Sequence, residues 1–245
     1  MNGAPRAAAS IVELVPGVSA LAAGLLWLHA TRTIVAADLH FAYEDVIGGA
    51  LPVWSTPEIT AKLLAAAQRM KAEEIVLLGD VIHGSRMSDG AACTVRESLD
   101  ALRAVARLTL VAGNHEGRSR GASILGDTVE FAHRDGWLLL HGDRHPELLE
   151  RREARCIIGH LHPSLGLGGG MSAPAFLASP RLVVVPAMTP YSRGLDVFSN
   201  ACMNALAPFG IESRRELHVV VAAGDLLYPF GGLSQIRTAM RERRI

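Results

Sequence analysis

Polar side chains that can bind metals or transfer protons follow five apolar segments of this chain, each at the point where the segment ends. In chain order these side chains are Asp38, His40, Asp80, Asn114, His115, His141, His160 and His162. One such ending is easily a coincidence. Five are hard to attribute to packing, because a buried carboxylate without a partner is costly. The five endings therefore predict one shared site.

The residue types indicate the chemistry of that site. Oxygen ligands from Asp and Asn together with neutral imidazoles suit divalent ions such as Mn, Fe or Zn. A shared carboxylate can hold two such ions close together, and a two-ion site stabilises both the attacking and the leaving oxygen of an in-line displacement at phosphorus. The ions also acidify a bound water, which makes hydroxide available near neutral pH. The pattern therefore favours hydrolysis of a phosphate ester.

The spacing within the endings favours convergence of the side chains. Asp38 and His40 are two positions apart, as are His160 and His162, and side chains two apart in an extended or turning segment can point the same way. In three of the five endings a glycine stands directly before the first candidate ligand, which lets the chain turn tightly where ligands crowd.

The first half of the chain alternates short apolar runs with helix-like segments, which predicts an α/β fold. Strands are expected at "TIVAADLH" through Ala37, at "IVLLGD" and at "LTLVAGNH", with an amphipathic helix at 55–74 and a second helix at 93–108. These segments form two successive βαβ units. Right-handed crossovers put the carboxyl ends of parallel strands on one edge, and open sheets bind ligands at that edge. The polar endings should meet there.

After Gly136 the pattern changes to strand candidates with fewer long helices between them. Strands are expected at 136–143, 154–163, 181–188 and 216–228, and a short helix at 199–210 that ends at its proline and glycine. This favours a second sheet packed on the first. The glycine-rich stretch "GLGGGMSAPA" has neither phosphate-loop nor Rossmann spacing, and we interpret it as a flexible loop beside the site.

Composition limits the class of protein. The 245 residues are 49% hydrophobic, which is enough for one large core, so we expect a single domain over residues 1–245. The 24 basic and 24 acidic residues cancel, so no overall field draws the chain to nucleic acid or to a membrane surface. Three cysteines without CxxC spacing fit a reducing compartment, and we expect a cytoplasmic protein.

The apolar stretch from Leu14 to Ala30 is the one segment that resembles a membrane anchor. It is interrupted by Pro16 and by glycines, and it falls short of the roughly 20 apolar residues that a spanning helix needs. We interpret it as two short buried strands with "VPGVS" as the turn between them. No membrane partner is expected.

The ordered motifs "DLH", "GD", "GNHE", "H" and "GHLH", over positions 38–162, resemble those of the calcineurin-like metallophosphoesterase superfamily. The resemblance implies a four-layer α/β/β/α sandwich, in which two mixed sheets lie face to face with helices outside. It also implies a hydrolase that uses two divalent metal ions, with manganese as our first expectation and iron or zinc as alternatives.

The resemblance also implies a role for each residue by its motif position. One metal would be held by Asp38, His40 and His162, and the second by Asn114, His141 and His160, with Asp80 as the bridge. His115 would not bind metal. It would face the phosphoryl group and stabilise developing charge or protonate the leaving oxygen. Glu116 would orient His115. For His83, a supporting or substrate role and a local turn hydrogen bond both stay open.

The stretches "ADLHFAYE", "LLGDVIHG" and "GHLHP" look more narrowly like the small prokaryotic branch that includes ligase-associated metallophosphoesterases of DNA repair. That likeness implies a phosphodiester substrate, either DNA or a nucleotide, and repair proteins such as a ligase or helicase as partners. The alternatives are a phosphomonoesterase or phosphoprotein phosphatase that uses the same site, and a non-catalytic scaffold that binds a partner. The oligomeric state is left open.

Basic residues give little further support for a nucleic-acid partner. The basic runs at 151–155, 214–215 and 241–244 are short and lie among acidic residues, so we interpret them as solvated surface. Arg118, Arg120 and Arg193 are candidates to grip a phosphate, although solvated surface is the simpler interpretation for each. No basic stretch is interleaved with aromatic residues of the kind that stacks single-stranded bases.

Overall fold

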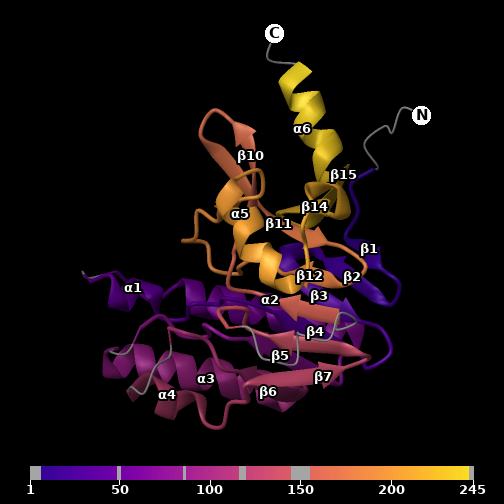
Figure 1. Cartoon of the computed structure of the whole chain (residues 1–245). Coiled ribbons are helices and arrows are strands. Elements are labelled where there is room, and N and C mark those ends of the chain that lie inside the picture. Colours follow the sequence, from indigo (N-terminus) through magenta and orange to yellow (C-terminus); the bar gives the residue numbers. More distant parts are fainter. Residues whose placement is uncertain (1–6, 49–50, 85–86, 116–119, 145–154, 243–245) are drawn as a thin grey trace.

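The computed structural model describes residues 7–48, 51–84, 87–115, 120–144 and 155–242. Two mixed sheets are packed between two groups of helices, with α2 (Ser55–Met70), α3 (Asp89–Val105) and α4 (Arg120–Leu125) against the first sheet and α5 (Asn200–Leu206) and α6 (Leu233–Glu242) against the second. Figure 1 shows α3 and α4 in its lower part and α5 and α6 in its upper part. The predicted α/β fold with two mixed sheets and flanking helices is confirmed.

The first sheet has six strands in the order of the chain. They are β1 (Ile11–Val15), β2 (Val18–Leu21), β3 (Leu25–Leu28), β4 (Thr33–Ala36), β5 (Glu74–Leu78) and β6 (Arg107–Val111). Strands β1 to β4 are antiparallel neighbours, whereas β4, β5 and β6 run parallel. Helices α2 (Ser55–Met70) and α3 (Asp89–Val105) connect the parallel strands. The two predicted βαβ units are therefore confirmed.

The second sheet has nine strands. Seven follow one path, in the order β13 (Leu195–Asp196), β10 (Pro163–Gly168), β11 (Met171–Ala178), β12 (Leu182–Val184), β9 (Arg155–Ile158), β8 (Trp137–Leu140) and β7 (Phe131–Arg134). Strand β14 (His218–Ala223) pairs with β11 and with β15 (Leu226–Gly232). Only β12, β9 and β8, and the short pair of β10 with β13, run parallel among the paired strands of this sheet.

Three apolar layers hold the sheets and helices together. In β4 and β5, alternate residues point to opposite faces, as the pleat requires. Ile34 and Ile75 pack toward α2 and α3, whereas Val35 and Val76 pack against the second sheet, where Phe176 lies in the same layer. The outer face of the second sheet is covered by α5 (Asn200–Leu206) and α6 (Leu233–Glu242). Because both faces of the parallel strands are covered, ligands can approach only at the strand ends.

Three details differ from the sequence-based predictions. The stretch from Leu14 to Ala30 contains the end of β1 and the whole of β2 and β3 instead of two strands, because a second turn at Ala22–Gly24 follows the expected turn at Pro16 and Gly17. The segment 216–228 contains a hairpin, because Gly224 in the left-handed conformation separates β14 from β15. The interpretation of 166–175 as a loop is wrong. Gly169 and Gly170 form the turn of the β10–β11 hairpin, whereas Gly166 and Gly168 lie in β10 and pair with β11.

Two smaller features complete the described fold. The short helices α1 (Tyr43–Val46) and α4 (Arg120–Leu125) follow the ends of β4 and β6 along the chain. Cys93, Cys156 and Cys202 are free thiols.

Among the described residues, no helix combines the length and the apolar content that a membrane-spanning helix requires.

A buried ion pair links the first sheet to β7 of the second. Glu74, whose side chain is fully buried, accepts hydrogen bonds from Arg134 on β7 at 2.6 Å and from Thr109 on β6 at 2.7 Å. Arg107 also donates to it, at 3.2 Å. Burial alone would raise the Glu74 pKa, but the hydrogen bonds from both arginines and Thr109 more than offset this and lower it to about 2.

Replacing Glu74 with glutamine should lower the free energy of unfolding at neutral pH by about 3 kcal/mol, because the change leaves Arg134 without its anion. The stabilisation from a lowered carboxyl pKa is complete above the unfolded value of 4.5 and disappears as the pH falls toward the folded value of about 2. Urea denaturation at pH 7, 4.5 and 3 should therefore show the two proteins converging in acid. Glu73→Gln, at a side chain that is 69% exposed, is the matched control. A constant difference at all three pH values would contradict this account.

Candidate metal centre

The eight side chains predicted from the strand ends lie together at one edge of the two sheets. They follow the carboxyl ends of β4, β5, β6, β8 and β9. Three groups bring candidate ligand atoms within 4.8 Å of one another: Asp38 with His40 and His162, Asp80 with His141 and His160, and His40 with His83 and His115. Asn114 joins the second group, because its Oδ1 lies 2.9 Å from Nε2 of His141.

In the first group, one carboxylate oxygen is held and the other is free to bind a cation. The backbone N–H of His160 donates to Oδ2 of Asp38 at 2.8 Å. Oδ1 is buried and has no hydrogen-bond partner among the described residues, although Nε2 of His162 lies 3.2 Å away. A buried anionic oxygen without a donor is costly. A divalent cation held by Asp38, His40 and His162 would satisfy it.

In the second group, several lone pairs converge on Nε2 of His141. Nδ1 of His141 lies 2.8 Å from the carbonyl oxygen of Leu78, which can only accept, so Nδ1 carries a hydrogen. In the neutral ring Nε2 then has a lone pair, and it faces Asn114 Oδ1 at 2.9 Å, Asp80 Oδ2 at 3.3 Å and His160 Nδ1 at 3.2 Å. This excess of acceptors over donors fits a divalent cation.

Electrostatics agree with that assignment. Burial alone would lower the pKa of His141, but its contact with Asp80 and the charge of Asp38 raise it to about 9. Burial alone would likewise raise the pKa of Asp80, but interactions with His141 and the backbone N–H of His115 hold it well below its usual value. Asp80 is therefore an anion under all ordinary conditions. The same negative charge that favours a proton on His141 would favour a metal cation.

The candidate ligands adopt an unusual backbone conformation. The φ angles are positive at 54° for Asp38, 47° for His40, 47° for Asp80, 61° for His160 and 45° for His162. Of the two conformations expected for the D-x-H and H-x-H pairs, extended or turning, both pairs therefore adopt the turning one. Left-handed residues re-aim the chain after β4, β5 and β9, and such conformations gather at functional sites because the surrounding structure must hold them.

Glycines next to the ligands are required for close approach as well as for turning. Gly79 has a φ of +73°, and a Cβ there would lie 2.7 Å from Cγ of His141. Gly113 does not have a positive φ, but a Cβ on it would overlap the backbone nitrogen and the carboxylate of Asp80. A Cβ on Gly159 would lie 2.6 Å from Cβ of Ala37 and 2.8 Å from Oδ2 of Asp38.

Gly159→Ala should therefore lower metal affinity and destabilise the fold by about 1–3 kcal/mol, because neither Ala37 nor Asp38 has room to move. Metal content after gel filtration and thermal unfolding measure the two effects. Gly166→Ala on β10 is the control, since a Cβ there meets nothing within 4 Å. Equal metal content in the two variants would show that the contact with Asp38 does not matter.

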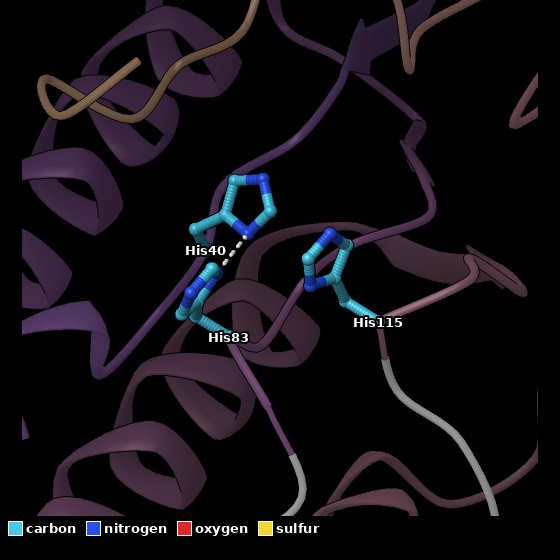
Figure 2. Close-up of side chains that lie close together, drawn as sticks. All are labelled: His40, His83 and His115. Atoms are coloured by element: carbon cyan, nitrogen blue, oxygen red, sulfur yellow. Dashed lines mark hydrogen bonds between the residues drawn. The ribbon is translucent and has the colours of Figure 1, made fainter. Parts of the chain in front are cut away.

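A cluster of three histidines lies at the open side of the site (Figure 2). Nδ1 of His83 is 2.9 Å from Nδ1 of His40, so one of the two nitrogens donates and the other accepts. The rings of His83 and His115 stack at 5.1 Å. Burial, and the neighbouring imidazoles, lower the pKa of His40 to about 3 although Asp80 opposes the shift. His40 is thus neutral, the form that can bind a metal.

The structure also settles the environment of His83, for which the sequence left two interpretations open. Its ring bonds to a histidine 43 positions away, so the side chain does not serve only as a local turn residue. Its pKa is lowered by burial and by His115. His115 itself has a side chain that is 43% exposed and lies 3.9 Å from Oδ2 of Asp80, where incoming groups can reach it.

Sequence reasoning missed the segment between β12 and β13. Ser192 lies 2.6 Å from Nδ1 of His162 through its hydroxyl and so orients that ring. Backbone N–H groups of Met188 and Thr189 donate to the carbonyls of Ala37 and Asp38. No spacing rule could have revealed these contacts, because they depend on how the second sheet meets the first.

Several sequence-based assignments fall outside the described residues. These are Glu116, Arg118, and the basic run at 151–155 except for Arg155. The side chain of Arg120 and the run at 241–244 are likewise not described. Arg155 stacks on the ring of Trp137 at 3.9 Å, and Arg214 donates to the carbonyls of Phe198 and Ser199. Both therefore have structural contacts.

The family model for calcineurin-like phosphoesterases matches residues 31–152. The chain belongs to this family, and is therefore a hydrolase acting on phosphoester bonds. Its fold is similar to that of nuclease MPE from Pseudomonas putida, with a TM-score of 0.65 and 19% identity over 89% of this chain and 98% of that chain. At this identity the likeness shows a shared fold. Comparison with curated proteins gave no match.

Proposed function

We propose that the protein is a dinuclear-metal-dependent phosphodiesterase whose substrate is DNA or a nucleotide. The observation that carries the proposal is that oxygen and nitrogen lone pairs converge in two groups, Asp38 with His40 and His162, and Asp80 with His141, His160 and Asn114. One ion would be held by Asp38, His40 and His162 and the other by Asn114, His141 and His160, with Asp80 shared. Manganese is the first expectation, with iron or zinc as alternatives.

The two ions, when bound, would supply Lewis acidity toward the phosphoryl oxygens and lower the pKa of a water. The chain's own residues do the rest. His115, half exposed beside Asp80, would hydrogen-bond to the phosphoryl group and protonate the leaving oxygen. His83 supports this geometry on two sides, by its bond to His40 and by its stacking on His115.

Two observations support a diester over a monoester. The solved structure with the same fold is titled a nuclease. The motif likeness to ligase-associated phosphoesterases points the same way, and with it come a role in DNA repair and ligase or helicase partners. From composition and cysteine usage the proposal adds a cytoplasmic location and a single-domain organisation over residues 1–245. A phosphomonoesterase or phosphoprotein phosphatase on the same site remains the competing function.

The direct test is hydrolysis of bis(p-nitrophenyl) phosphate and of p-nitrophenyl phosphate after chelation and reloading with manganese, iron or zinc. We expect turnover only with added metal, and faster turnover of the diester. Linear and circular DNA, single- and double-stranded, then define the natural substrate. Hydrolysis of the monoester alone would favour the phosphatase, and no turnover with any metal would favour a scaffold.

A further inference from the structure

Three aromatic side chains continue outward from the histidine cluster. We call Tyr43, Trp54 and Tyr191 the aromatic wall. The rings of Tyr43 and Tyr191 stack at 4.5 Å with an interplanar angle of 14°, and Trp54 meets Tyr191 edge-on at 5.9 Å. Tyr43 in turn contacts His83 at 4.4 Å, and His83 stacks on His115. The wall is thus connected, ring to ring, with the proposed catalytic histidine.

Three separate segments build the wall. Tyr43 begins α1, Trp54 directly precedes α2, and Tyr191 lies between β12 and β13. The hydroxyl of Tyr191 donates to Oε1 of Glu44 at 2.9 Å, and this fully buried carboxylate also accepts the backbone N–H of Ser55 at 2.8 Å. Burial and Glu44 raise the pKa of Tyr191, so its hydroxyl stays protonated and can donate. Through Glu44, these hydrogen bonds hold Tyr191 against α1 and the start of α2.

The outer end of the wall is exposed. Trp54 is 45% exposed, whereas Trp27 and Trp137, the other two tryptophans of the chain, are 8% and 0% exposed. Ile47 and Leu51, in the same connection between α1 and α2, are also exposed. Exposed apolar side chains of this kind favour a binding surface. A flat group of a substrate would fit the exposed ring of Trp54.

We propose that the aromatic wall stacks an unpaired nucleobase of the strand that is cut, with Trp54 as the exposed stacking surface. Every nucleobase has a π face, so such stacking tolerates any sequence. A base inside a duplex already stacks on its neighbours, so the wall would favour single-stranded DNA over duplex DNA. This inference rests on the proposed phosphodiesterase function. The sequence has no basic stretch interleaved with aromatic residues, and the wall instead assembles its rings from three distant segments.

Tryptophan fluorescence tests the contact without relying on turnover. The full chain carrying His115→Asn and loaded with manganese would be titrated with tetrathymidylate and with the same oligomer made of abasic residues. We expect quenching by the thymidine oligomer and little by the abasic one, because only Trp54 is open to contact. Trp54→Phe should remove the signal. Equal quenching by both oligomers, or none by either, would overturn the proposal.

Cleavage kinetics give the second test, in the otherwise unchanged manganese enzyme. Trp54→Ala should lower kcat/KM for single-stranded oligothymidylate by about 10- to 100-fold, the range that loss of one base–aromatic stack produces. Cleavage of an oligomer with abasic residues beside the cut should change less than about twofold, since no stack is lost there. Trp54→Phe should retain most of the activity, and Phe230→Ala, at an exposed aromatic on β15, is the control.

The two proposals fail in different ways. If no diester of any kind is cleaved, the proposed function is wrong, and the fluorescence titration still decides whether bases bind the wall. If diesters are cleaved but Trp54→Ala lowers kcat/KM equally for the normal and the abasic oligomer, the proposed function stands and the stacking proposal is wrong.

Discussion

Replacing Asp80 with asparagine should lower kcat/KM for a phosphodiester by about a thousandfold, because a shared anion that supports two ions contributes several kcal/mol to the transition state. The substitution keeps the shape of a side chain that is only 2% exposed. It removes the negative charge that interacts with His141 and His40. The loss of activity should therefore come from weaker metal binding and not from a destabilised fold.

Metal content separates these causes. After gel filtration, the parent protein should retain two ions per chain and Asp80→Asn fewer, as measured by inductively coupled plasma mass spectrometry. Asp225→Asn, in the turn between β14 and β15, is the matched control and should retain both ions. An Asp80→Asn protein that keeps both ions and its activity would remove Asp80 from the bridging position.

His115→Asn is expected to have the second large effect, and of a different kind. Loss of a general acid slows proton transfer by about 10²–10⁴-fold. The loss should be largest for DNA, whose leaving alkoxide needs a proton, and much smaller for a nitrophenyl ester, whose leaving group departs as an anion. Metal content should not change, because His115 is assigned to the phosphoryl group and not to an ion.

That last measurement decides between two roles for His115. Its ring nitrogen also lies close enough to those of His40 and His83 for all three to hold one ion. If His115→Asn loses an ion and the loss of rate is equal for both leaving groups, His115 is a ligand. His133→Asn, at an exposed histidine on β7, should behave as the parent does.

The sequence predicted the parts of the structure that follow from strand topology. Parallel strands joined by helices must bring their carboxyl ends to one edge, so Asp38, Asp80 and Asn114 could be expected to meet without knowledge of their contacts. The βαβ half was predictable because its periodicity is local. The second half was harder, since a glycine-rich stretch such as 166–175 becomes a hairpin only through its pairing partner.

The remaining contacts were not predictable, because they join residues far apart in the chain. Tyr191 reaches Glu44 across 147 positions, and His162 reaches Ser192 across 30. Neither contact has a spacing rule. The left-handed backbone at Asp38 and His40 also has no sequence signal beyond residue type, because the neighbouring strands impose it.

The segment between β12 and β13 has a consequence for how this protein can diverge. It donates to the backbone of Asp38 through Thr189, orients His162 through Ser192, and carries Tyr191 of the aromatic wall. Mutations in this segment that adapt the enzyme to a new substrate would also disturb Asp38 and His162 and so weaken metal binding. New specificities should therefore arise in the connection before Trp54, which carries no proposed ligand and can vary without loss of the catalytic machinery.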